Sequence, residues 1–217
     1  MDNEIIDIFN DQHEYIGQAT KKEAHENGWW HRVFTCIVIN SEKKTMVLQK
    51  KAPERYSFQR PDYLDIAVGG HYQMGEKIED GIREIKEELG IDVSFERLIP
   101  LGVRQTVASI TPNYINKEFQ HIFLLVENRL LFEYPLRSFE VNGLVELPIE
   151  KGIQLLLGKS NQLKGSGIFQ KQRKIVEVEL TRSDFVPSYL KTDQFMLRIF
   201  IVAHRYLKGE DLSLLFW

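Results

Sequence analysis

The sequence has little of what marks several protein classes. Its 217 residues include one cysteine, Cys36, which excludes an internal disulfide framework and favours a reducing compartment. No apolar run approaches the roughly 20 residues of a membrane-spanning helix. The acidic start MDNEIIDIFN lacks the basic-then-apolar order of a secretory signal. The formal net charge is −3, without the basic excess typical of nucleic-acid binding. We therefore expect a cytoplasmic protein that binds neither nucleic acid nor membrane.

The composition and the order of apolar patterns favour an α/β protein. Hydrophobic residues make up 43% of the chain, and no repeat or linker divides it, so we expect a single domain over 1–217. The run HRVFTCIVIN (31–40) predicts a buried central strand. Three parts follow from the pattern: an N-terminal β-hairpin over 1–20, a core over about 30–180, and a C-terminal helical extension over 187–217 with one long helix at 187–209.

Four other segments receive less definite predictions. Polar KKEAHENGWW (21–30) is expected to be a connection without regular structure, and glycine-rich SNQLKGSG (160–167) a flexible loop. Two strands are expected at 97–108 and 118–127, joined by a loop over 109–117. The alternation in KIVEVELT (174–181) predicts an exposed edge strand.

The stretch EKIEDGIREIKEELG predicts a helix over 76–90 that ends at Gly90. At 100° per residue, three glutamates of this helix share an arc of about 100°: Glu84, Glu87 and Glu88. A solvated acidic flank is one explanation, because such repulsion costs only a few tenths of a kcal/mol. The preceding Gly69–Gly70 pair favours another. Carboxylates on one helical face, with a closely approaching backbone carbonyl, suit a hard divalent cation such as Mg²⁺ or Mn²⁺.

The stretch GGHYQMGEKIEDGIREIKEELGI (69–91) resembles the Nudix box, the signature of hydrolases that act on nucleoside diphosphates linked to another moiety. The fixed positions of that box are filled by Gly70, Glu76, Arg83, Glu84, Ile85, Glu87, Glu88, Gly90 and Ile91. One departure is visible. Six residues, KIEDGI, separate Glu76 from Arg83, where the box has seven. The shorter spacing leaves the 83–91 half of the box intact, and it affects whether Glu76 can reach Arg83.

The resemblance implies a fold and a reaction. It implies a Nudix-like α/β/α sandwich with a central mixed sheet, and a divalent-metal-dependent pyrophosphohydrolase that cleaves a small-molecule diphosphate. It assigns Mg²⁺ or Mn²⁺ to three carboxylates and one backbone carbonyl: Glu84, Glu87, Glu88 and Gly69. Arg83 matches the arginine that holds the first glutamate of the box, Glu76.

The resemblance leaves the general base and the substrate contacts open. Family members use either a box glutamate or one from a distant loop. Glu84 is the first choice, because it could take a proton from the attacking water. Glu118 is the second, against the simpler explanation of a strand-end surface residue. Arg60, in QRPDYLD (59–65), is a candidate substrate contact or an exposed loop arginine.

The segment EAHENGWWHRVFTCIVIN (23–40) is similar to the entry segment of isopentenyl-diphosphate isomerases. In those enzymes two histidines there, and one in the glycine turn, bind a second metal. His25, His31 and His71 stand at comparable places, with the 25–31 spacing one residue short. The isomerases carry a catalytic cysteine two residues before the glycine-turn histidine, where this chain has Gly69. Cys36 lies in an apolar strand and is interpreted as a core thiol, so the isomerase ranks behind the hydrolase.

Two further alternatives stay open. A Nudix module that binds nucleotides without hydrolysing them is the second class of function, although every box carboxylate is present. The apolar content of 187–207 and of LSLLFW (212–217) would suit a homodimer contact. No motif names the sugar, nucleobase, coenzyme or isoprenoid that the diphosphate would carry.

Overall fold

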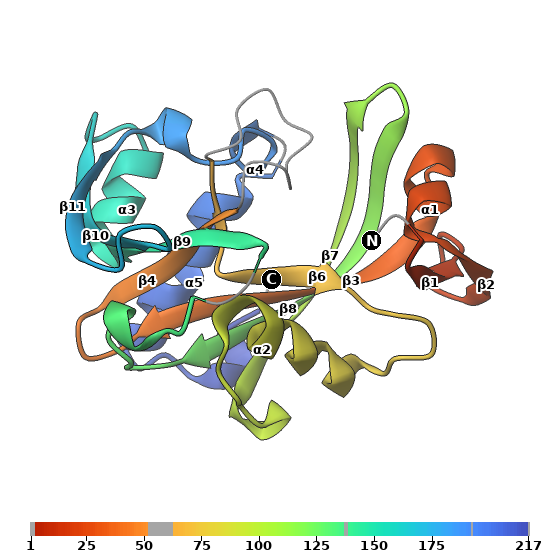
Figure 1. Ribbon diagram of the computed structural model, residues 1–217, viewed down its shortest axis with the longest axis horizontal. Helices are drawn as coiled ribbons and strands as arrows, with labels where there is room; N and C mark the ends of the chain where they lie inside the picture. Colours follow the sequence, from red (N-terminus) through yellow and green to blue (C-terminus); the bar gives the residue numbers. More distant parts are fainter. Residues whose placement is uncertain (1–2, 52–62, 137–138, 192, 217) are drawn as a thin grey trace.

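The computed structural model describes residues 3–51, 63–136, 139–191 and 193–216, so Arg60 lies outside the described residues. Its strands form one twisted sheet (Figure 1), whose main path runs β11-β10-β9-β4-β3-β1-β2. The strands are β1 (Ile5–Phe9), β2 (Tyr15–Thr20), β3 (Trp30–Asn40), β4 (Thr45–Lys51), β5 (Leu64–Ile66), β6 (Val68–His71), β7 (Leu98–Thr111), β8 (Tyr114–Val126), β9 (Val141–Pro148), β10 (Leu163–Phe169) and β11 (Ile175–Leu180). The α-helices are α1 (Lys21–Asn27), α2 (Arg83–Leu89), α3 (Ile149–Leu156), α4 (Ser188–Lys191) and α5 (Phe195–Leu207).

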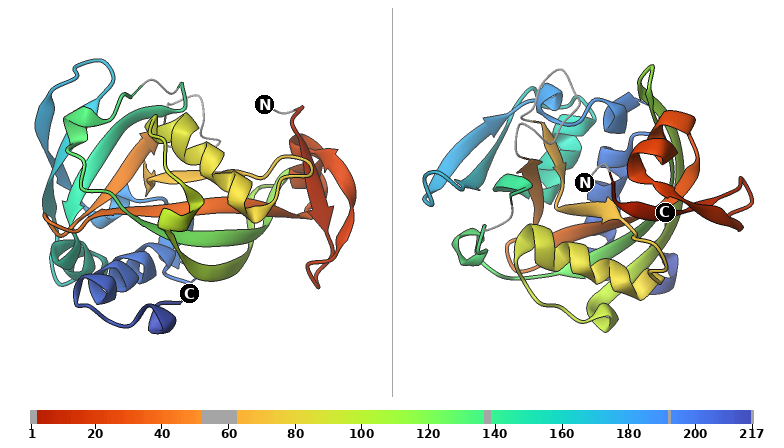
Figure 2. Two further views of the ribbon diagram at one scale, coloured as in Figure 1. Left: turned by 90° about the horizontal axis from the view of Figure 1, so that it is seen from below. Right: turned by 45° about the vertical axis from the view of Figure 1, so that its right-hand side comes forward.

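Strand β3 is the centre of the sheet. It pairs antiparallel with β4 and β6 and parallel with β8, which makes the sheet mixed. Because side chains alternate along a strand, β3 contributes to two cores. Phe34, Cys36 and Val38 pack on the side of α2, whereas Ile37 and Ile39 pack on the side of α3 and α5. Figure 2 shows α2 on one side of the sheet and α3 with α5 on the other. The predicted α/β/α sandwich with a mixed sheet, an N-terminal hairpin and a C-terminal helix is confirmed.

The predicted helix over 76–90 is wrong in its first half. Residues Ile78–Ile82 form a 3₁₀ helix, and the α-helix is confined to Arg83–Leu89. A 3₁₀ helix rises about 2.0 Å per residue, against about 1.5 Å in an α-helix. Five 3₁₀ residues therefore advance about 10 Å, as far as six to seven α-helical residues. The steeper rise lets these residues cover more distance than they would in an α-helix. Gly90, at φ +72°, ends the helix as predicted.

Four other predictions need correction. The segment 21–30 contains helix α1, which begins with a capping box between Thr20 and Glu23. The segment 160–167 contributes to strand β10. The expected loop over 109–117 is largely strand, because β7 and β8 continue to Thr111 and from Tyr114, and their outer half extends away from the sheet (Figure 1). The long helix at 187–209 is divided into α4 and α5.

The division of the C-terminal helix has a local cause. Gln194, directly before α5, has a left-handed backbone with φ +54°, which a continuous helix does not allow. Helix α5 still buries one apolar face against the sheet and α3, as the pattern of its sequence predicts. Among the described residues, no helix combines the length and the apolar character needed to cross a bilayer.

Candidate active site and two candidate metal centres

Strand β6 brings the glycine pair directly against helix α2. Gly70 pairs with Phe34 and faces α2, so that a Cβ atom on Gly70 would lie only 2.1 Å from the carboxyl carbon of Glu84. Real Cβ atoms essentially never approach so closely. Position 70 therefore requires glycine because the Glu84 carboxylate occupies the space of a side chain. Glu84 is itself only 8% exposed.

Glu88, one turn further along α2, is held by three neighbours. Its Oε2 accepts hydrogen bonds from the amide of Gly69, over 2.8 Å, and from Nε2 of buried Gln49, over 3.2 Å. Lys51 Nζ lies 3.9 Å from the other oxygen, Oε1, too far for a hydrogen bond. Oε1 is buried and has no hydrogen-bond partner in the described part of the chain. One oxygen of the Glu88 carboxylate is thus fixed by two hydrogen bonds, whereas the other oxygen accepts none from the described residues.

Arg83 connects the carboxylates to the loop before them. Its Nε donates to Glu76 Oε1 over 2.9 Å, so the pairing of these two residues forms despite the shortened box. Nη1 donates to Glu87 Oε2 over 2.9 Å, and Nη2 lies 3.0 Å from Glu84 Oε1. Glu87 is exposed, unlike Glu84 and Glu88. Arg83 therefore organises three carboxylates of the box at once.

Burial dominates the electrostatics of this cluster. It raises the pKa of Glu84 to about 8, against the opposing charge of Arg83, and the neighbouring glutamates raise it further. It also raises the pKa of Glu88 to about 7, although Lys51 and the Gly69 amide favour the charged form. Two carboxylates with raised pKa values and one unpartnered buried oxygen form an oxygen donor set that suits a divalent cation.

Three histidines meet on the opposite face of the sheet. His25 comes from α1, His31 from β3 and His71 from β6, and their candidate ligand nitrogens all lie within 4.8 Å of one another. His25 Nε2 is 3.1 Å from His71 Nε2. Position 71 follows Gly70 on β6, so its side chain points away from α2. The structure brings together the three histidines that the sequence singled out.

The hydrogen bonds of the histidines indicate where their protons lie. Nδ1 of His25 is 3.2 Å from the Ile115 carbonyl, and Nδ1 of His31 is 2.9 Å from the Trp29 carbonyl. A carbonyl can only accept, so both Nδ1 atoms carry the proton and both Nε2 atoms present lone pairs. The Nε2 of His31 is buried, and none of the described residues forms a hydrogen bond with it.

Burial lowers the pKa values of all three histidines, to about 4 for His25, to about 3 for His31 and well below the usual range for His71. At neutral pH the rings are therefore uncharged. Three converging neutral imidazoles, of which His25 and His31 direct lone pairs inward, are a donor set for a borderline metal such as Zn²⁺.

Comparison with known proteins decides the family. The family model described as the NUDIX domain matches residues 29–150, which is more than half of the chain. The chain belongs to the Nudix hydrolase family. A Nudix hydrolase of Clostridium acetobutylicum, itself described as uncharacterized, is 37% identical over 86% of this chain and 92% of its own length.

Other relatives of this Nudix protein are more distant. A Nudix hydrolase of Deinococcus radiodurans is 29% identical over 46% of this chain and 57% of its own length. An isopentenyl-diphosphate Δ-isomerase of Photorhabdus laumondii is 28% identical over 56% of this chain and 66% of its own length. A crystal structure of a Deinococcus radiodurans protein superposes with a TM-score of 0.53 at 24% identity, over 71% of this chain and 90% of that one. This last similarity supports the fold alone.

Glu118 does not lie beside the Nudix carboxylates. It pairs with His31, three positions along β3 from Phe34, and so faces away from α2. It is buried, and its Oε2 accepts from Gln120 over 2.6 Å. Its place on the histidine side of the sheet gives no support to Glu118 as the base for chemistry at Glu84.

Reasoning from the sequence missed three residues at the Nudix site. Gln49 and Lys51 reach Glu88 from the same face of β4. Gln49 is fully buried, and the available signal was a polar residue directly after the apolar run Met46–Leu48. Glu140 precedes β9, whose Val141 pairs with Lys51. Burial is the main cause of the raised pKa values of Glu84 and Glu88, and the negative charge of Glu140 raises both pKa values further. No motif marks Glu140.

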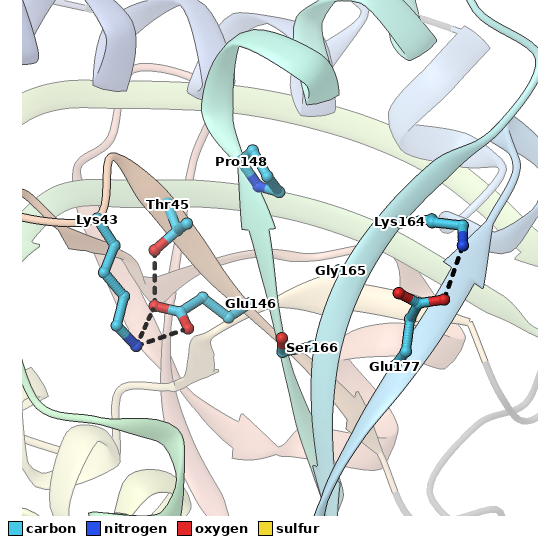
Figure 3. Close-up of a pocket in the computed structure, with 8 residues that line it drawn as sticks. All are labelled: Lys43, Thr45, Glu146, Pro148, Lys164, Gly165, Ser166 and Glu177. Carbon is cyan, nitrogen blue, oxygen red and sulfur yellow. Dashed lines mark hydrogen bonds and ion pairs between the residues drawn. The ribbon is translucent and has the colours of Figure 1, made fainter.

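A separate polar pocket of about 420 Å³ lies over β4, β9, β10 and β11 (Figure 3). Its four charged side chains are paired within it: Lys43 Nζ lies 3.1 Å from Glu146, and Lys164 Nζ lies 2.8 Å from Glu177. It contains no residue of the Nudix box. We assign it no part in the chemistry.

Proposed function

We propose that this Nudix protein is a divalent-metal-dependent pyrophosphohydrolase that cleaves a diphosphate linkage in a nucleoside diphosphate derivative or a related compound. One observation carries the proposal. Glu84 and Glu88 are buried on one face of α2 with raised pKa values although Arg83 and Lys51 lie nearby, and within the described residues Oε1 of Glu88 accepts no hydrogen bond. Burying two carboxylates so close together is costly unless a cation compensates them, because buried charges are poorly solvated.

The residues of the box would divide the work as follows. Glu84, Glu87, Glu88 and the Gly69 carbonyl would hold Mg²⁺ or Mn²⁺. The bound cation would supply positive charge toward the diphosphate oxygens, on which negative charge develops. Glu84 would take a proton from the attacking water while the water oxygen forms a bond to phosphorus. The bridging P–O bond then breaks, and the leaving phosphate keeps the electron pair.

The test is a pair of charge-removing variants. Glu88→Gln and Glu87→Gln should keep the fold and lose most metal-dependent turnover. Glu79→Gln is the matched control, because Glu79 is exposed, lies in the same segment and makes none of the box contacts. A panel of diphosphate compounds with Mg²⁺ or Mn²⁺, read by released phosphate or monophosphate, would supply the assay and the substrate class. Full activity of both box variants would refute the assignment.

Two rival functions have distinct signatures. An inactive nucleotide-binding module would show tight nucleotide binding by calorimetry, with no product from any compound of the panel. An isomerase would convert isopentenyl diphosphate directly. The Photorhabdus isomerase relative gives a reason to run that assay. Gly69, at the position where the isomerases carry cysteine, gives a reason to expect no turnover.

We also infer that His25, His31 and His71 bind a second metal ion. The support is their geometry: three neutral rings, two with protons directed outward to carbonyls, and ligand atoms within 4.8 Å of one another. The isomerase resemblance leads to the same three residues. A single domain over 1–217, a cytoplasmic location and a homodimer stay predictions from the sequence.

A further inference from the structure

The N-terminal hairpin β1–β2 precedes the matched 29–150 region, yet it is hydrogen-bonded to the loop of the Nudix box. The amide of Met74 donates to the Ile5 carbonyl over 2.9 Å. The amide of Gly75 donates to Asp7 Oδ2 over 3.0 Å. Both donors lie within the two residues that precede Glu76. The hairpin therefore fixes the backbone directly before Glu76.

Arg32 of β3 connects the same aspartate to Glu76 itself. Its Nη2 donates to the Glu76 carbonyl over 2.7 Å and lies 3.7 Å from Asp7 Oδ2. The guanidinium lies 5.0 Å from the Phe9 ring centre and 5.4 Å from that of Tyr72. Asp7 and Arg32 keep only 11% and 16% of their side-chain surface exposed. The pair is thus enclosed, and Glu76 is held through its own carbonyl and the preceding amide.

The carboxylate of Glu76 continues this chain of contacts to helix α2. It accepts from Arg83 Nε over 2.9 Å, and Arg83 in turn contacts Glu84 and Glu87. The carboxylate also accepts from the Gln73 amide over 2.7 Å, which closes the loop on itself. The orientation of the Arg83 guanidinium group therefore depends on the position of Glu76.

We propose that Asp7 is a positioning residue for the metal-binding carboxylates, and that it acts through Gly75, Arg32 and Glu76 on Arg83. The N-terminal hairpin then helps to position the metal-binding carboxylates of the Nudix site in this chain. The inference rests on the proposed function, because it assumes that Glu84, Glu87 and Glu88 bind the cation. It adds a residue and an element that the box does not contain.

The experiment measures Mn²⁺ binding by electron paramagnetic resonance, which needs no substrate. The component of binding that Glu88→Gln abolishes belongs to the carboxylates, and only this component is followed. Asp7→Ala should weaken it about 10-fold, as is typical when a partner that orients metal ligands is removed. Asp7→Asn keeps an acceptor for Gly75 but loses the charge facing Arg32, and should give a smaller loss. Glu14→Gln is the control, since it removes a charge from the exposed end of the same hairpin.

Thermal unfolding of the metal-free variants separates positioning from stability. If Asp7 only stabilises the fold, Asp7→Asn lowers the unfolding temperature and leaves the Mn²⁺ affinity of the folded protein unchanged, and the proposal is refuted. Weaker affinity in both Asp7 variants, with Glu14→Gln like wild type, supports it. If wild type itself binds no Mn²⁺ at the carboxylates, the proposed function and this inference both fail. Normal binding in wild type and in both Asp7 variants removes the inference alone.

Discussion

The carboxylate of Glu84 fills the space that a side chain on Gly70 would need: the carboxyl carbon of Glu84 lies 2.1 Å from the position of a Cβ atom on residue 70. Gly70→Ala should therefore displace Glu84 and abolish most metal-dependent turnover. The overpacking should also destabilise the protein by about 1–3 kcal/mol, measured by urea denaturation.

A double mutant shows whether the clash is the cause. In a Glu84→Ala background the carboxylate is absent, so Gly70→Ala should cost much less stability than in wild type. An equal cost in both backgrounds would refute contact with Glu84 as the cause.

The stability of the metal-free protein should fall as pH rises. The folded pKa values of Glu84 and Glu88, about 8 and about 7, exceed the unfolded value of 4.5. The folded state therefore binds more protons between pH 4.5 and 8. Each carboxylate contributes stability that is complete below pH 4.5 and is lost as pH rises to its folded pKa, with a slope of up to about 1.4 kcal/mol per pH unit. Denaturant titrations of wild type and Glu88→Gln should diverge over this range.

Mg²⁺ should counteract this loss. The cation needs ionised ligands, so the increase in unfolding temperature on adding Mg²⁺ should grow between pH 6 and pH 8. An increase that is independent of pH, or one that survives in Glu88→Gln, would contradict binding at these carboxylates.

The histidine cluster should bind Co²⁺ with visible absorption bands. His71→Ala removes one of three ligands and should weaken binding by at least about 100-fold, the upper range for loss of a mere orienting partner. His204→Ala is the control, because His204 lies on α5 near Glu150, outside the cluster. Equal spectra for wild type and His71→Ala would exclude the cluster as the binding site.

Asp193 should stabilise the attachment of the C-terminal helices. Its carboxylate accepts from Arg104 Nε and Nη2 over 2.7 and 2.9 Å, and Arg104 is 5% exposed. Asp193→Ala leaves that guanidinium with Gln120 as its remaining hydrogen-bond acceptor, and should cost about 2–3 kcal/mol, somewhat less than for a fully buried pair. The exposed Lys164–Glu177 pair has a similar length, 2.8 Å, but because it is screened by solvent Glu177→Ala should leave the stability almost unchanged.

The sequence was sufficient for the central strand and the carboxylate cluster, because both follow from short-range periodicity, whereas the sandwich was implied by the resemblance to the Nudix box. Its errors have physical causes. Glycines at 165 and 167 suggested a loop, but a Cβ on Gly165 would lie 2.4 Å from a methyl carbon of Leu147, so this glycine permits close packing within a sheet. Helix α1 was missed although Thr20 and Glu23 form a capping box, because its polar residues show no clear apolar period.

The partners of Glu88 could not be predicted in the same way. Gln49 and Lys51 are 39 and 37 positions away from it in the chain, and only the pairing of strands brings them to α2. The convergence of His25, His31 and His71 was reached through a family resemblance, since no local pattern relates one helix to two strands.

The 3₁₀ segment at Ile78–Ile82 has a consequence for recognising such proteins. A search pattern that demands seven residues between the first glutamate and the arginine would reject this chain, although both side chains meet over 2.9 Å. In this chain six residues are enough to bring Glu76 and Arg83 together, with five of them wound as a 3₁₀ helix.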